Sequence, residues 1–501
     1  MHSDRAALLR ALIFIAVFTV FARLCTSEFT WYDEAVNIHQ NPLMNPPTLK
    51  SVAYYWKAVG PQAPGGLYIP LTYTLWSLVA RLTYSDFPVA SGIHLNPWAF
   101  HTLNVLLHAL ATVVVFNILR LLLRRDWAAA LGAMIFAVHP IQVEAVGWIA
   151  GTKDVLCGLL CMVAVWQWIL FRQNDAAPRR RVHYVVAIVA FVASMLAKPT
   201  GMVTPLILLG LDLLILRRGK IRQIIAPLWP WFVLSLLCAV STRLAQPPWG
   251  AAAVPIWQRP LIALDSLAFY LVKLIVPIHF AVDYGRTPDR AMQQGIGWML
   301  AILPVLAIVL AWRARKRHPL IAVSITLFIV GLAPVLGFVP FLFQVFSGVT
   351  DHYVYISMLG VALACGSSAT QIPPRAAMPV GSGVVILLSI LAFHQTMFWR
   401  DDVSLWTHTI QINPRSYLAL TNRGAAFFRQ GKLKEAEDDF RAAIELNPAY
   451  PDVQFNLGLI LERTGRAAEA AEHFRRAIEL NSSFNEARGQ LRQLPATMRD
   501  G

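Results

Sequence analysis

Long apolar stretches, separated by short polar ones, follow one another up to about residue 400. A membrane-spanning helix needs roughly 20 mostly apolar residues to cross the hydrocarbon core of a bilayer. Stretches of this kind lie at 7–24, 98–123, 127–145, 153–171, 183–198, 200–216, 224–241, 294–312, 319–337, 353–370 and 377–396. The pattern predicts an all-α protein whose main part is a polytopic membrane helix bundle of 11 crossings.

Two further apolar stretches, 67–83 and 260–278, are interpreted from the charges between the segments. Basic residues cluster at Arg120, Arg124 and Arg125; at Arg172 and Arg179 to Arg181; at Arg217, Arg218, Lys220 and Arg222; and at Arg313, Arg315, Lys316 and Arg317. All four clusters fall inside, as the positive-inside rule requires, only if the two stretches do not cross. We therefore expect juxtamembrane helices in the outer interface. The N-terminus is then inside, as a retained signal anchor, and the C-terminus outside.

The composition supports this interpretation, because 56% of the residues are hydrophobic and only 14% are charged. The net charge of +15 follows from the positive-inside rule, so we expect no nucleic-acid partner. Residues 1–400 hold 14 of the 28 acidic residues, and the last 101 residues hold the other 14. This shift predicts a membrane domain over residues 1–398 and a soluble domain over 399–501. Cys157 and Cys161 are one helical turn apart inside an apolar stretch, and we interpret them as core residues.

The soluble tail repeats itself with a period of 34 residues. Matching pairs at that offset include Asn422 and Asn456, Gly424 and Gly458, Phe440 and Phe474, and Asn447 and Asn481. Small residues that let paired helices approach, with Phe in the seam, are typical of the tetratricopeptide repeat (TPR). The tail then consists of half a repeat, two full repeats and a capping helix. Asn422 and Asn456 are candidates for a face that binds an acceptor or a partner.

The first predicted outer loop carries two adjacent carboxylates, Asp33 and Glu34, directly after the first apolar segment. A carboxylate at this boundary can take the proton of an acceptor hydroxyl as general base, or it can bind a divalent cation such as Mg²⁺ or Mn²⁺. Adjacent side chains diverge, so we expect one to react and the other to orient. The sequence leaves open which one is the base and whether a metal takes part, with Asp33 and Asp154 as its ligands if it does.

Other ionisable residues at the predicted outer ends of the segments are candidates for the same cavity, because such groups are costly in a membrane unless they face a cavity or a partner. A lysine there supplies a point charge suited to phosphate. His101, Asn104 and His108 share one face of a segment, but no second His or Cys cluster completes a zinc site. The candidates for binding a donor phosphate or sugar are His101, His139, Glu144, Lys153, Asp154, Lys198, Asp351, His352 and Tyr353.

Several of these motifs, in this order along the chain, resemble a known family. They are Phe100 to His108, His139-Pro140 to Glu144, Trp148 to Asp154, Lys198-Pro199, Asp351 to Tyr355 and Trp399-Arg400-Asp401. With Asp33-Glu34 after an N-terminal anchor, the chain resembles the GT-C glycosyltransferases, polytopic enzymes that use polyprenyl-phosphate sugars. Within that group it resembles the transmembrane and tetratricopeptide-repeat protein O-mannosyltransferases and their bacterial relatives.

The resemblance implies an inverting hexosyltransferase that moves a sugar, with mannose as a candidate, from a polyprenyl phosphate to a hydroxyl on the outer face. The acceptor would be a protein Ser or Thr or a glycan, recruited by the TPR domain. By the same resemblance Asp33 is the base, and Lys153, Asp154, Lys198 and the group Asp351-His352-Tyr353 hold the donor. Relatives often carry Arg where this chain has His352. A bacterial inner membrane, with the TPR domain on the periplasmic side, is the expected location.

Two other functions remain as alternatives. An O-antigen-ligase-like transferase also carries outward repeats, but it uses polyprenyl-pyrophosphate donors and basic groups in late loops. A non-catalytic, membrane-anchored TPR scaffold would need the face around Asn422 and Asn456, and it would not need Asp33, Lys153 or Lys198.

Overall fold

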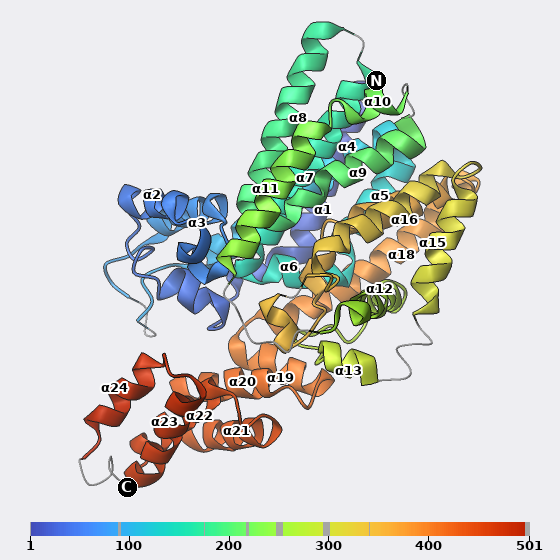
Figure 1. The fold of residues 1–501 in the computed structure, drawn as a ribbon. Helices are drawn as coiled ribbons and strands as arrows, with labels where there is room; N and C mark the ends of the chain where they lie inside the picture. Colours follow the sequence, from blue (N-terminus) through green and yellow to red (C-terminus); the bar gives the residue numbers. More distant parts are fainter. Residues whose placement is uncertain are drawn as a thin grey trace. The chain divides into compact units, whose positions relative to one another are not determined.

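The computed structural model of the chain describes residues 2–88, 92–174, 176–216, 220–246, 254–293, 301–339 and 341–495 (Figure 1). Within these ranges the residues form helices joined by loops, and the sole β feature is an isolated bridge between Met44 and Pro47. The predicted all-α class is confirmed. Two compact units divide the chain. The first holds Met1–Phe29, Asp33–Phe280 and Arg286–Trp399, and the second holds Thr30–Tyr32, Ala281–Gly285 and Arg400–Gly501.

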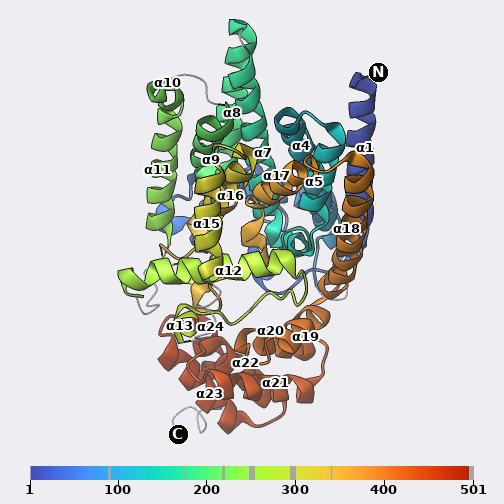
Figure 2. The same ribbon diagram turned by 90° about the vertical axis from the view of Figure 1, so that its right-hand side faces the viewer.

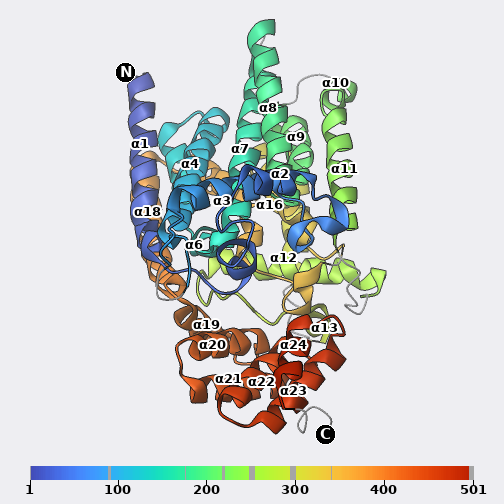
Figure 3. The same ribbon diagram turned by 90° about the vertical axis from the view of Figure 1, so that its left-hand side faces the viewer.

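The first unit is a bundle of long helices with shorter ones at its ends. Its helices are α1 (His2–Phe21), α2 (Leu49–Lys57), α3 (Pro70–Thr83), α4 (Pro97–Leu123), α5 (Asp126–Val138), α6 (Val143–Gly147), α7 (Thr152–Gln173), α8 (Ala177–Ala197), α9 (Thr204–Leu211), α10 (Ile221–Ile225), α11 (Trp229–Ala245), α12 (Arg259–Ile275), α13 (Pro288–Gln293), α15 (Ile302–Ala314), α16 (Pro319–Leu332), α17 (Met358–Ala369) and α18 (Pro374–Gln395). Helices α1 and α18 lie side by side at one edge of this unit, and α11 lies at the other (Figure 3).

Within the described residues, six helices are long and apolar enough to cross a membrane: Asp4–Thr26, Pro97–Leu123, Ile149–Gln173, Ala177–Ala197, Pro199–Leu216 and Pro374–Trp399. A seventh span results if Asp126–Val138 and Pro140–Gly147, bent by 51° at the break, cross together. Four apolar helices are shorter: Trp229–Ala245, Ile302–Ala314, Pro319–Val335 and Met358–Ala369. Each predicted segment coincides with one of these helices, although residues 294–300, Arg217 and Arg218 lie outside the described part. The multi-pass membrane character is confirmed, whereas the number and orientation of the crossings stay predictions.

The outer surface of the bundle is apolar along several of these helices. Leu236 on α11, Leu310 on α15 and Ile390 on α18 are 60% exposed or more. Polar side chains such as Asn104 and His108 are instead fully buried among the helices. A helix bundle in hydrocarbon requires this arrangement, because lipid covers the apolar faces and polar groups must find partners inside the protein.

The two stretches that were predicted not to cross form α3 and α12. With 14 and 17 residues they extend over about 21 and 26 Å, less than the roughly 30 Å of a hydrocarbon core. Figure 2 shows α12 lying crosswise to α11, α15 and α18. Its Asp265, Ser266 and Tyr270 are buried with its apolar residues, while Ile275 is exposed. Helix α12 therefore lies across one end of the bundle.

The second unit is a helical repeat. Its helices are α19 (Asp402–Ile412), α20 (Tyr417–Arg429), α21 (Leu433–Leu446), α22 (Pro451–Arg463), α23 (Ala467–Leu480) and α24 (Asn485–Gln493). The positions that match at an offset of 34 residues fall on the helix pairs α20–α21 and α22–α23, apart from Asn447 and Asn481, which directly follow α21 and α23. Helices α20 and α21 pack so closely that a Cβ on Gly424 would lie 2.8 Å from the Phe440 ring. One on Gly458 would lie 2.6 Å from the Phe474 ring. Glycine is required at both positions by this approach of the helices, as the repeat pattern predicts.

Two short segments from the loops of the membrane domain belong to this second unit. Residues 30–32 precede Asp33, and residues 281–285 follow α12. Asp283 accepts a hydrogen bond of 2.6 Å from the Ser416 hydroxyl, and Ser416 in turn accepts one of 3.0 Å from the Ala419 N–H at the start of α20. The main part of the second unit starts at Arg400, one residue after the predicted start of the TPR domain.

Candidate active site

The two carboxylates of the first loop lie in different surroundings. Glu34 is fully buried, and its Oε1 accepts a hydrogen bond of 2.8 Å from the Ile149 N–H. The Asp33 side chain is 37% exposed. The pair therefore diverges in the way that adjacent residues must. Glu34 connects the first loop to Ile149 in the second, and Asp33 is the more exposed of the two carboxylates.

Asp33 faces a lysine at the start of α7. Its Oδ2 lies 3.6 Å from the Nζ of Lys153, and that ammonium group lies 4.7 Å from the centre of the Trp148 ring. The backbone carbonyl of Asp33 accepts a hydrogen bond of 2.7 Å from Asn37, whose side-chain oxygen accepts one of 2.6 Å from the Tyr73 hydroxyl. Helix α3, which carries Tyr73, thus helps to fix the backbone of Asp33.

A buried polar network fixes the backbone from which Lys153 projects. The Thr152 hydroxyl donates to Asn104 Oδ1 at 2.6 Å and accepts from Trp76 Nε1 at 3.0 Å. Asn104 donates to the Trp148 carbonyl at 2.9 Å. On the same face of α4, His108 contacts the Tyr355 hydroxyl at 2.8 Å. The polar face of α4 that the sequence showed therefore holds neighbouring segments in place.

Lys198 and Asp154 form a second, tighter ion pair. The Nζ of Lys198, just after α8, lies 2.5 Å from Asp154 Oδ1, and both side chains are less than 10% exposed. The same ammonium group lies 5.5 Å from the centre of the Tyr353 ring. Two oppositely charged groups that are buried together offset much of each other's desolvation cost.

Glu144 and the segment before α17 make the third part of the cluster. One Glu144 oxygen lies 2.7 Å from His352 Nδ1, and the other accepts a hydrogen bond of 2.9 Å from the Asp351 N–H. Burial lowers the pKa of His352, and the positive charges of Lys198 and Lys153 lower it further. The imidazole is therefore neutral at pH 7. It does not supply a permanent positive charge to the cluster.

The contacts join residues that are far apart in the chain into one continuous cluster. From Asp33 it runs through Lys153 and Trp148 to His352, which contacts both Glu144 and Tyr353, and Tyr353 leads on to Lys198 and Asp154. Two other candidates have separate partners. His101 Nε2 contacts the Glu28 carbonyl at 3.1 Å. His139 Nδ1 accepts from the Ile141 N–H at 3.2 Å, and so caps the short turn Pro140–Gln142.

The two carboxylates that were considered as ligands of a divalent cation are each paired with a lysine, and metal binding stays a prediction. Asp33 and Asp154, the two ligands considered from the sequence, each face a lysine ammonium group. No group of three or more His, Cys, Asp or Glu side chains able to hold a metal occurs in the part of the chain that the structure describes. A divalent cation needs several oxygen ligands and gains nothing from neighbouring cations.

Some residues of the cluster were not singled out from the sequence. Asn37, Tyr73, Trp148 and Thr152 fix Asp33 and Lys153 through hydrogen bonds or ring contacts. Trp148 and Thr152 lie within the motif Trp148 to Asp154, and Asn37 lies four residues after Asp33. In the second unit, Asn422 and Asn456 occupy equivalent places on α20 and α22. The Asn422 amide donates to the Leu418 carbonyl at 2.8 Å, and both Asn side chains are partly exposed.

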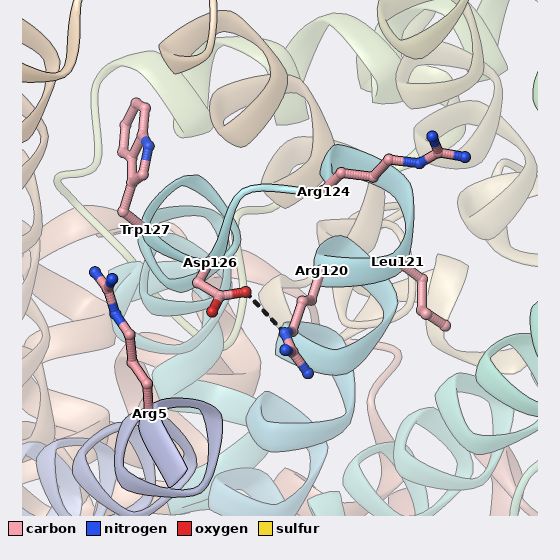
Figure 4. A pocket seen from close by; sticks show the side chains of 6 residues that line it. All are labelled: Arg5, Arg120, Leu121, Arg124, Asp126 and Trp127. Carbon is pink, nitrogen blue, oxygen red and sulfur yellow. Dashed lines mark hydrogen bonds and ion pairs between the residues drawn. The ribbon is translucent and has the colours of Figure 1, made fainter. Parts of the chain in front are cut away.

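A cavity of about 550 Å³ lies at the start of α1 and at the junction of α4 and α5. Figure 4 shows its lining residues, which are Arg5, Arg120, Leu121, Arg124, Asp126 and Trp127. Arg120 is paired with Asp126 at 2.7 Å. Arg5 lies in the first turn of α1 and Asp33 follows the end of this helix, so 16 residues of α1 after Arg5, about 24 Å of helix, separate them. The cavity carries basic residues that were assigned to the inner side, and it is not part of the Asp33 cluster.

Comparisons with known proteins bear on this cluster. Residues 91–244 match the family model for dolichyl-phosphate-mannose-protein mannosyltransferase, and residues 413–483 match the tetratricopeptide repeat. A protein O-mannosyl-transferase of Caenorhabditis elegans is 22% identical over 84% of this chain and 60% of its own length. The protein O-mannosyl-transferase Tmtc2 of Drosophila melanogaster is 28% identical over 38% of this chain and 22% of its own length. The resemblance to the transmembrane and TPR O-mannosyltransferases is confirmed.

The matches to these O-mannosyltransferases cover only part of the relatives, because this chain spans 60% of the length of the C. elegans protein and 22% of that of the fly protein. Solved structures with similar chains include ArnT from Cupriavidus metallidurans bound to undecaprenyl phosphate. The match is 14% identical, covers 94% of this chain and 80% of that chain, and has a TM-score of 0.41. A second is the oligosaccharyltransferase of Archaeoglobus fulgidus. That match is 12% identical, covers 94% of this chain and 71% of that chain, and has a TM-score of 0.44. The segment that matches the mannosyltransferase family contains Glu144, Lys153, Asp154 and Lys198.

Proposed function

We propose that this chain is a membrane glycosyltransferase that moves a sugar from a polyprenyl-phosphate donor to a hydroxyl group on the outer face of the membrane. The family model that spans Lys153 and Lys198, and the names of the relatives, favour mannose as the sugar and a protein Ser or Thr as the acceptor. The observation that carries the proposal is the pairing of a partly exposed carboxylate, Asp33, with the ammonium group of Lys153 inside the buried cluster.

In the proposed reaction Asp33 is the general base. One of its oxygens takes the proton of the acceptor hydroxyl while the acceptor oxygen forms a bond to C1 of the sugar. The bond between C1 and the donor phosphate breaks on the opposite face, and the phosphate leaves with the electron pair of that bond. Attack opposite the leaving group inverts the configuration at C1. A positioned base contributes about 10²- to 10⁴-fold to such a step.

The two lysines have different roles in this proposal. The 3.6 Å between Lys153 and Asp33 exceeds the roughly 2.7–2.9 Å of a charge-assisted hydrogen bond, so Lys153 is free to turn toward a phosphate. Lys198 is bound to Asp154 at 2.5 Å and contributes its charge from a fixed place. Together they stabilise the negative charge that develops on the leaving phosphate. Glu34 orients the first loop through the Ile149 N–H.

A donor comparison tests the proposal. The purified full chain in lipid nanodiscs is incubated with a Ser- and Thr-containing protein acceptor and one labelled donor: polyprenyl-phosphate mannose, a polyprenyl-pyrophosphate sugar, or a nucleotide sugar. We expect transfer from the monophosphate lipid alone. Transfer only from the pyrophosphate lipid would replace the proposal with the ligase-like alternative. Absence of transfer from every lipid donor would contradict it and favour a TPR scaffold.

A further inference from the structure

A basic cavity lies where the start of α1 meets the junction of α4 and α5. It holds about 550 Å³, which is within the roughly 300–1,000 Å³ of sites for small molecules. Helix α1 packs against α4 and α5, so the walls of the cavity come from one compact unit. Its polar lining consists of Arg5 in the first turn of α1, Arg120 and Arg124 at the end of α4, and Asp126 and Trp127 at the start of α5 (Figure 4).

The cavity carries more positive charge than its own acid balances. Three arginines and one aspartate line it, which gives a formal charge of +2. Arg120 Nε lies 2.7 Å from Asp126 Oδ1, whereas no carboxylate in the described part of the chain pairs with Arg5 or Arg124. Cations that gather without anionic partners repel one another, and a bound anion offsets that repulsion. Because a guanidinium group binds a phosphate through two parallel N–H···O bonds, the lining favours a phosphate.

An apolar stripe on α1 starts at this cavity. Leu8, Leu12 and Ile15 follow Arg5 at intervals of three or four residues, so they lie on the same face of the helix. These three side chains are between 52% and 60% exposed, whereas Val17 on another face is buried. In a membrane-spanning helix such a stripe lies against the acyl chains of the lipid. An anion bound at Arg5 is therefore next to a continuous apolar surface.

Trp127 stands between the polar and the apolar parts of this surface. Its partly buried side chain lines the cavity, and tryptophan is enriched at the headgroup level of membranes because its ring is apolar and its N–H is polar. Further along α1, Arg10 Nε donates to Asn117 Oδ1 at 2.9 Å and so holds α1 against α4. A soluble phosphate makes no use of the apolar stripe, whereas a phospholipid matches both parts of the surface.

We propose that this cavity binds the phosphate of one anionic phospholipid, with an acyl chain along the apolar stripe of α1. Arg5 and Arg124 bind the phosphate oxygens, and the ion pair between Arg120 and Asp126 holds the start of α5 against the end of α4. The excess of positive charge selects a headgroup with a net negative charge, as basic pockets between membrane helices do. The site lies apart from the Asp33 cluster, so it does not depend on the proposed sugar transfer.

The chain provides a matched control for this inference. Arg5→Gln/Arg124→Gln removes two charges from the cavity and leaves its ion pair intact. Arg125→Gln/Arg181→Gln also removes two charges, from exposed arginines that do not line the cavity. Arg125 directly follows Arg124, and Arg181 belongs to the basic cluster at the start of α8. If these arginines serve only the positive-inside distribution, the two double variants bind lipid equally.

Native mass spectrometry of the purified full chain, titrated with dioleoyl phosphatidylglycerol, measures the binding. We expect one tightly bound lipid per chain, with a Kd about 30-fold higher in Arg5→Gln/Arg124→Gln and within about 2-fold of the wild type in the control variant. Arg5→Lys/Arg124→Lys keeps both charges and should recover most of the affinity. Dioleoyl phosphatidylcholine, which has the same acyl chains and no net charge, should bind the wild type at least about 10-fold more weakly.

Glycerol 1-phosphate distinguishes a lipid site from a site for a soluble phosphate. It carries the headgroup phosphate without acyl chains, so at millimolar concentration we expect it to leave phosphatidylglycerol bound. Displacement of the lipid would make the cavity a site for a soluble phosphate and overturn the lipid assignment. Equal weakening in the two glutamine variants, or equal affinities for the two lipids, would overturn the site itself.

Discussion

The Nζ of Lys153 lies 3.6 Å from the Oδ2 of Asp33, although Asp33 lies in the first loop, Lys153 lies at the start of α7, and helices α2 to α6 separate the two residues in the chain. This pair places a cation beside the proposed base, where the donor phosphate must come close to the acceptor hydroxyl. The proposed chemistry therefore depends on both members of the pair, for different reasons.

Replacement of Lys153 by Met should weaken the use of the donor. Without the ammonium group the leaving phosphate loses a compensating charge, so we expect kcat/KM for the polyprenyl-phosphate sugar to fall about 100-fold. Lys153→Arg keeps the charge and should retain a larger share of the activity. Lys57→Met, at the exposed end of α2, is the control. Steady-state kinetics with varied donor decide the point, and a Lys153→Met enzyme with an unchanged kcat/KM would remove this lysine from the site.

The buried pair of Lys198 and Asp154 should be more sensitive to the loss of one partner than of both. Lys198→Met leaves the Asp154 carboxylate without its cation, and removal of one partner of a buried pair costs about 3–5 kcal/mol. The double variant Asp154→Asn/Lys198→Met removes both charges, so it should be more stable than Lys198→Met alone. Thermal unfolding of the purified variants measures the difference. A double variant less stable than the single one would show that the pair is not coupled in this way.

Close packing at the repeat glycines predicts that glycine-to-alanine substitutions within the second unit differ in their effect on stability. Gly458→Ala places a Cβ 2.6 Å from the Phe474 ring and should destabilise the repeats by about 1–3 kcal/mol. Gly489→Ala on α24 meets no atom within 4 Å, so it should be neutral or slightly stabilising, because alanine favours the helix. Hydrogen exchange of α22 and α23 in the full chain reports both effects. Equal protection in the two variants would contradict the packing described here.

The raised pKa of Asp402 predicts that the stability of the repeat unit depends on pH. Burial raises its pKa to about 6, against the attraction of Arg429. Between about pH 4 and 6 the folded chain keeps a proton that the unfolded chain has lost, so the stability of the repeat unit falls as the pH rises through this range. Two pKa units correspond to about 3 kcal/mol. Exchange protection of α19 and α20 at pH 4.5 and 6.5 should show this fall in the wild type and a smaller one in Asp402→Asn. The same slope in both would refute the assignment to Asp402.

Much of the fold was predictable because its signals are local. A continuous apolar stretch identifies a membrane helix without knowledge of its neighbours. A 34-residue period identifies paired helices through matching positions such as Gly424 and Gly458 or Phe440 and Phe474. The crosswise helix α12 required one further step, in which the basic clusters limited the number of crossings.

The candidate site was predictable only as a set of residues. The sequence placed Asp33, Lys153 and Lys198 at corresponding ends of their helices, because antiparallel crossings bring alternate loops to one side. It could not show which charges pair, since the Lys198 and Asp154 contact depends on the packing of α7 against α8. The hydrogen bond from the Trp31 N–H to Asp402 joins residues 371 positions apart, and no local sequence pattern predicts it.

The direct test of the central claim is the turnover of Asp33→Asn with a labelled polyprenyl-phosphate mannose and a protein acceptor. Asn keeps the size of the side chain and cannot take a proton from the acceptor hydroxyl. Asp86→Asn, an exposed loop acid, is the matched control. We predict that kcat falls at least about 100-fold in Asp33→Asn and stays near the wild-type value in Asp86→Asn. Turnover near the wild-type rate by a folded Asp33→Asn enzyme would contradict the assignment of Asp33 as the base.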